Sequence, residues 1–158
     1  MTNSHTASAA ALDESNDLDK IVLYALDEAM EKLEQNGELE PFTVILHGGN
    51  LHVESHSGED AVECFNAAST ALQLLAHVMD AYVFAYDGYI NTDTDTRDAI
   101  IVERGKPGQT EAEAYAILYT LDEGDDGVLS FEEGIYDLGP APSMLEGAPA
   151  TSDDLEMF

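Results

Sequence analysis

Residues 114–133 read AYAILYTLDEGDDGVLSFEE, and the fold depends on whether this stretch is a hairpin or a helix–loop–helix. Alternation typical of a β-strand runs through Tyr115, Ile117, Tyr119 and Leu121. A helical spacing fits Ala114, Ile117, Leu118 and Leu121 equally well. The segment after the acidic centre is more decisive, because Gly139-Pro140 would end a second helix early and Gly134 inside it would cost about 1 kcal/mol. The stretch therefore predicts a β-hairpin with its turn within residues 122–127.

The same acidic centre, residues 122–133, resembles the calcium-binding loop of an EF-hand. Its candidate ligands are Asp122, Asp126, Ser130 and Glu133, and Gly127 stands where that loop turns sharply. Gly124 occupies the third ligand position, so one oxygen is missing, and the chain has no complete second loop to pair with. The resemblance implies Ca²⁺ binding as the alternative to a solvated turn.

A second hairpin is predicted over residues 42–55, where two β-prone runs flank Gly48-Gly49-Asn50. A two-residue turn places Phe42, Val44, Leu46, Leu51 and Val53 on one face. If the turn is centred on Gly49-Asn50, His47 and His52 stand directly opposite each other with Glu54 on the same face. That constellation is a candidate site for zinc or another transition metal, and the alternative is a solvated polar face.

Two helices and further strands complete the expected fold. The first helix begins near Asn16 or Asp17 and stops at Asn36-Gly37, and the second opens with a capping box from Ser57 to Asp60. Strands are expected over 81–86 and 98–103. We expect an α+β domain in the order α-β-β-α-β-β-β-β, with both helices on one face of a mostly antiparallel sheet. Residues 1–15 are expected to be a disordered leader, 16–138 the domain, and 139–158 a loose acidic tail.

The composition is dominated by negative charge. The 158 residues carry 33 Asp and Glu against 5 Lys and Arg, a net charge of −28 at pH 7. This field disfavours binding to nucleic acid or to an anionic membrane surface and favours cations and basic protein surfaces. Cys64 is the single cysteine, which excludes an intramolecular disulfide and a multi-thiolate metal site. Neither a signal peptide nor an apolar membrane span is evident, so a cytoplasmic location is expected.

No catalytic motif with a defined spacing occurs in the sequence. The favoured function is a non-catalytic protein-interaction module that engages a basic partner or a second copy of itself as a homodimer. The alternatives are a calcium-binding protein using residues 122–133 and a small enzyme whose site is assembled from distant residues.

Overall fold

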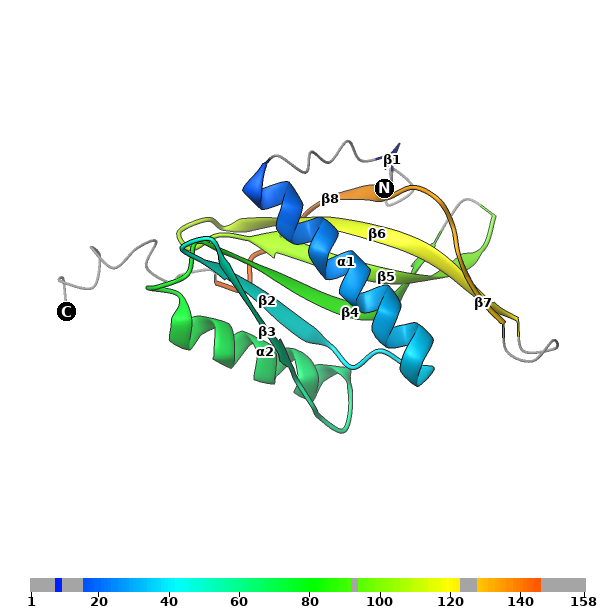
Figure 1. The fold of residues 1–158 in the computed structure, drawn as a ribbon, viewed down its shortest axis with the longest axis horizontal. Coiled ribbons are helices and arrows are strands. Elements are labelled where there is room, and N and C mark those ends of the chain that lie inside the picture. The colour runs from blue at the N-terminus through cyan, green and yellow to red at the C-terminus, as the bar shows by residue number, and fades with distance from the viewer. Residues whose placement is uncertain (1–7, 10–15, 92–93, 123–127, 146–158) are drawn as a thin grey trace.

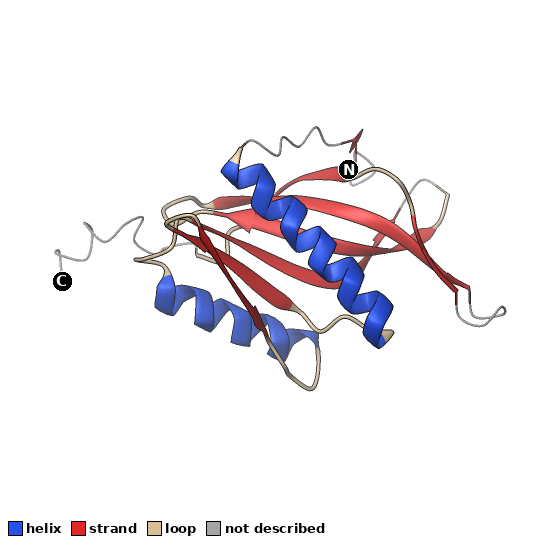
Figure 2. Ribbon diagram, in the orientation of Figure 1, coloured by secondary structure: helices blue, strands red, loops and turns tan. Residues whose placement is uncertain are grey.

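The computed structural model describes residues 8–9, 16–91, 94–122 and 128–145, and it is an α+β fold. In chain order the elements are β1 (Ser8–Ala9), α1 (Asp17–Asn36), β2 (Phe42–His47), β3 (Asn50–Ser55), α2 (Ala61–Leu75), β4 (Ala81–Asn91), β5 (Thr96–Gly105), β6 (Glu111–Asp122), β7 (Val128–Phe131) and β8 (Tyr136–Pro142). From α1 to β7 this is the expected order, and β8 follows as a further strand (Figure 2). In the described part of the chain, no helix is long and apolar enough to cross a membrane.

The sheet is antiparallel at every pairing, with strand order β1-β8-β6-β5-β4-β2-β3 and β7 paired to β6 beside that path. β4, β5 and β6 are its longest strands and lie at its centre (Figure 1). Among the described strands, β3 forms one edge of the sheet and pairs with β2 alone.

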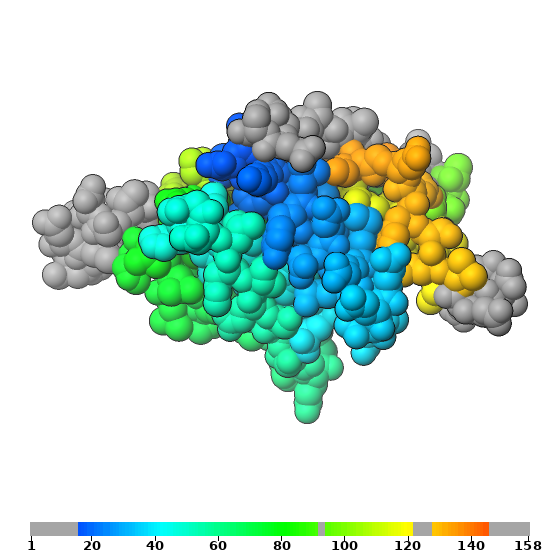
Figure 3. All heavy atoms as spheres, viewed as in Figure 1, coloured from blue at the N-terminus to red at the C-terminus, as the bar shows by residue number. Residues whose placement is uncertain are grey.

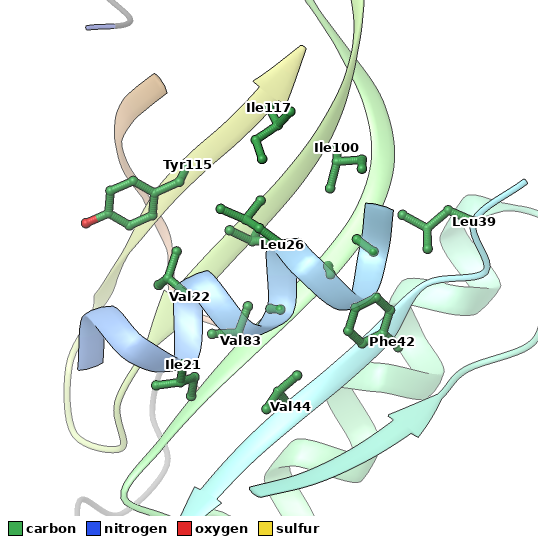
Figure 4. Close-up of a cluster of buried hydrophobic side chains, with 14 of the residues drawn as sticks. Ile21, Val22, Leu26, Leu39, Phe42, Val44, Val83, Ile100, Tyr115 and Ile117 are labelled. Carbon is green, nitrogen blue, oxygen red and sulfur yellow. The ribbon is translucent and has the colours of Figure 1, made fainter. Parts of the chain in front are cut away.

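Helix α1 covers one face of the sheet and buries the main hydrophobic core. Figure 1 shows it lying across the front of the strands, and in Figure 3 its side chains fill the middle of that surface. Apolar side chains return on one side of α1 at Ile21, Val22, Ala25, Leu26, Ala29 and Leu33, all of them buried. They pack on every second residue of the central strands, including Val83, Ile100 and Ile117 (Figure 4).

Helix α2 packs on the opposite face, so the expectation that both helices share one face is wrong. Alternation along β4 separates the two faces, because Val83 belongs to the α1 core whereas Tyr82 and Phe84 pack with Ala68 and Leu72 of α2. Helical periodicity identifies the apolar side of a helix but not the face of the sheet that it covers.

The helix ends follow the local sequence, with one shift. Asn16 caps α1 through its side-chain oxygen, which accepts from the Leu18 and Asp19 backbone N–H groups, and Gly37 ends the helix at φ 77°. Asp60, rather than Ser57, caps α2 by accepting from the Glu63 N–H at 2.9 Å. The expected capping box is therefore three residues too early.

The hairpin predicted for residues 114–133 is confirmed, because β6 and β7 pair from Tyr119↔Phe131 to Asp122↔Val128. The folded unit also continues beyond 138: β8 extends to Pro142, and Met144 and Leu145 are buried against α2 and β4. The Met144 N–H donates to the buried Tyr82 hydroxyl at 2.9 Å. The folded unit therefore includes a segment whose Pro and Gly content had suggested a loose tail.

Candidate functional site

The proposed calcium ligands lie at the β6–β7 hairpin. Asp122 is the last residue of β6, Ser130 lies on β7, Glu133 follows β7 and is exposed, and Asp126 lies outside the described residues. The flanking elements are strands rather than the helices of an EF-hand. Calcium binding at these residues stays a prediction.

The transition-metal site predicted at His47, His52 and Glu54 required a turn centred on Gly49-Asn50, and the structure has a different strand register. Gly48 and Gly49 form the turn with φ 57° and 85°, so His47 pairs with Asn50, His52 with Ile45 and Glu54 with Thr43. The predicted faces of this hairpin are nevertheless correct, because Val44 pairs with Val53 and Leu46 with Leu51. Within the described residues, no three His, Cys, Asp or Glu side chains are grouped so that they could hold a metal ion.

A cavity of about 770 Å³ lies around Arg104, Lys106 and the segment 108–113. Arg104 is buried and already satisfied: it donates to Asp19 of α1 at 2.8 Å and to Glu113 of β6, and its guanidinium lies 5.6 Å from the centre of the Tyr115 ring. Burial works against the charge of Arg104, but these hydrogen bonds outweigh it and leave its pKa above the ordinary value. Arg104 therefore links α1 to the sheet through its ion pairs. Because its guanidinium is already paired with carboxylates of the protein, its role is structural and not anion binding.

A smaller cavity of about 360 Å³ lies between the first half of α2 and the sheet. Its lining is mostly apolar and includes three aromatic rings, Phe65 of α2 and Phe84 and Tyr86 of β4. Phe65 and Phe84 meet edge to face at 5.9 Å between centroids, and Phe84 and Tyr86 lie 5.2 Å apart. The volume is within the range of about 300–1,000 Å³ typical of ligand pockets.

Glu103 is one of the two carboxyl groups that line this cavity. Glu103 of β5 stands directly opposite Phe84, and its Oε2 accepts a hydrogen bond of 2.7 Å from the Tyr86 hydroxyl. Burial raises the pKa of Glu103, and the bond from Tyr86 offsets this only in part. Burial and the neighbouring Glu103 charge raise the pKa of the Tyr86 phenol above its usual value. Among the described residues, no Lys, Arg or His forms an ion pair with Glu103.

The other polar groups of the cavity are a phenol and a second carboxyl group. The raised pKa of Tyr86 keeps its proton in place at neutral pH. Asp87 also lines the cavity, its carboxylate accepts from the Tyr119 hydroxyl at 2.6 Å, and burial raises its pKa. The cavity therefore offers apolar surface, aromatic rings and two carboxyl groups.

The outer side of α2 differs from that of α1. Its 15 residues contain a single carboxylate, Glu63, whereas the 20 residues of α1 contain six. Large apolar side chains are exposed there, with Val62 at 66% and Leu74 at 70% of their maximum. On a chain of net charge −28, a helix with a single carboxylate and exposed aliphatic groups is the clearest candidate contact surface.

Sequence reasoning did not single out Glu103 or the cavity beside it. The signal was present in the run Asp98–Glu103, because a carboxylate at the end of an apolar strand falls on the same side as Ala99 and Ile101. The sequence could not predict that Phe65 and Glu103 line the same cavity, since this depends on where α2 packs. Cys64, the single cysteine, is buried on the sheet side of α2.

Comparison with known proteins gives no family. The chain matches no protein-family model, no curated protein and no solved structure at a significant level.

Proposed function

We propose that the protein is a non-catalytic interaction module that binds a basic protein partner through the outer side of α2. The observation that carries this proposal is the weakly charged helix α2, with exposed Val62 and Leu74, on an otherwise strongly acidic chain. Burying such aliphatic groups contributes about 25 cal/mol per Å².

The charges around α2 support a basic partner over a second copy. Glu59, Asp60 and Glu63 surround its N-terminal end, and Asp80 follows its C-terminal end. Two copies of a chain with net charge −28 repel each other, whereas a basic rim on a partner would pair with these carboxylates. Contacts of this kind speed association and determine which partner is accepted.

The β3 edge is the competing contact surface. It could add a strand from another molecule, but it has only six residues and carries His52 and Glu54 among mostly exposed side chains. Short, charged edge strands are a common device against strand pairing. The edge therefore supports the proposal less well than α2 does.

The test compares capture by three baits: the wild type, Leu74→Asp on α2, and Glu34→Gln on α1 as a control. Proteins bound by the wild type and the control but not by Leu74→Asp are purified and titrated by calorimetry against the wild type. The proposal expects at least one basic protein that binds stoichiometrically and weakens about tenfold or more with Leu74→Asp. An identical set of captured proteins for all three baits would contradict it.

A further inference from the structure

We propose that the cavity between α2 and the sheet binds an organic ammonium group on an apolar stem, with Glu103 as its counter-ion and Phe65, Phe84 and Tyr86 as its walls. A lysine side chain of a partner and a small free alkylammonium share this chemistry. For the lysine source the inference rests on the proposed function, since the lysine would belong to the partner docked on α2.

The carboxyl group of Glu103 is the first support. It is held on a β-strand at the centre of the sheet, and it accepts a hydrogen bond of 2.7 Å from the Tyr86 hydroxyl. A carboxylate can accept about four hydrogen bonds, so capacity remains on the group that lines the cavity. A partly buried carboxylate without a cation is costly, and an incoming ammonium would relieve that cost.

The aromatic lining is the second support. A cation within about 6 Å of a ring centre is attracted by the ring's quadrupole, and this attraction grows when water is excluded. The protein already uses this interaction twice, because Lys32 lies 5.5 Å from the centre of the Phe42 ring and Arg104 lies 5.6 Å from that of Tyr115. Each of those two pairs involves one ring. The cavity combines three rings with a carboxylate, which makes it a more complete cation site.

The charge of the whole chain is the third support. At −28 the protein concentrates cations at its surface and speeds their arrival. A small inorganic ion holds its hydration shell and would therefore stay outside an apolar cavity. An alkylammonium can place its stem on Pro41, Val62 and Phe65. The combination selects an organic cation over sodium or potassium.

The experiment is a titration followed by ¹H–¹⁵N NMR on the full chain at constant ionic strength. The probes are n-butylammonium chloride and, as the neutral counterpart, n-butanol. We expect n-butylammonium to shift the backbone signals of Phe65, Phe84, Tyr86 and Glu103, and n-butanol to bind at least tenfold more weakly. Equal binding of the two probes, or shifts spread evenly over the acidic surface, would overturn the proposal.

Variants separate the site from the general charge. Glu103→Gln keeps an acceptor for the Tyr86 hydroxyl and should weaken n-butylammonium binding at least tenfold, whereas Glu34→Gln, which removes the same charge from α1, should leave it within twofold. Phe65→Leu keeps an apolar wall without the ring and should weaken binding severalfold. Unchanged binding in Glu103→Gln would overturn the proposal.

Two further arms identify the source of the ammonium and keep this inference apart from the proposed function. A lysine-containing peptide that binds at least tenfold more tightly than n-butylammonium, with the norleucine peptide as its control, indicates a partner's side chain. Weaker or equal binding of the peptide indicates a small free cation. Leu74→Asp should abolish partner capture but leave n-butylammonium binding unchanged, so either proposal can fail while the other stands.

Discussion

At the scale of single residues, Glu103 connects stability to pH. Its pKa is raised in the folded protein, so the native state holds the proton more tightly than the unfolded chain does. The corresponding contribution to stability is complete below the unfolded pKa of about 4.3 and is lost as the pH rises through the folded value. A glutamine at this position does not titrate and escapes that loss.

We therefore expect Glu103→Gln to become more stable relative to the wild type as the pH rises from 4 to 8. The gain at pH 7 should be below about 1 kcal/mol, because the cavity is open and solvent screens the charge. Urea unfolding at several pH values measures the difference. A variant that loses stability relative to the wild type over this range would show that the ionised carboxylate is favoured in the folded state.

Gly105 provides a second residue-scale prediction, based on close approach. A Cβ at this position would lie 2.6 Å from atoms of the Tyr82 ring, and that ring is fully buried with its hydroxyl held by the Met144 N–H. Because the ring cannot move away, Gly105→Ala should cost about 1–3 kcal/mol of unfolding free energy.

A double-mutant cycle with Tyr82→Leu tests whether this contact is the cause. Removing the ring should make the added methyl group less costly, so the two changes should be coupled by more than about 0.5 kcal/mol. Additive effects would mean that the alanine acts through the backbone of β5 instead.

At the scale of elements, periodicity and turn residues predicted most of this fold. Alternation predicted the two faces of β2 and β3, and the short glycine-bearing exit after Phe131 favoured strands for residues 114–133. The errors concern relations between elements: the face that α2 covers and the turn register beside His47. Those relations depend on packing partners distant in sequence, and the cavity at Glu103 depends on them as well.

The start of α2 gives an element-scale prediction. Asp60→Ala removes the acceptor for the Glu63 N–H and should lower stability by about 1 kcal/mol, whereas Asp60→Asn should keep most of it. Ser57→Ala, at the cap expected from the sequence, should cost less than about 0.5 kcal/mol, because its hydroxyl donates to the exposed Glu40 and not to the helix. Thermal unfolding by circular dichroism measures all three, and equal losses for Asp60→Ala and Ser57→Ala would contradict this assignment.

At the scale of the whole molecule, the charge of −28 acts against the compact state. Among the described residues, Arg97 and Arg104 account for the ion pairs, so most carboxylates have no cation beside them. Raising the ionic strength from 0.01 to 1 M shortens the Debye length from about 30 to 3 Å and screens their repulsion. The fold should therefore be stabilised by salt, in contrast to one held by surface ion pairs.

We expect the melting temperature to rise by several degrees as NaCl increases over this range, with KCl giving the same curve, because screening depends on ionic strength and not on the identity of the ion. Adding 1 mM CaCl₂ at constant ionic strength separates screening from a specific site. If the loop at residues 122–133 binds calcium, the melting temperature rises further in the wild type but not in Glu133→Gln, by mass action on the folded state. A melting temperature that falls with NaCl would mean that attractive pairs, and not repulsion, dominate the electrostatics of this fold.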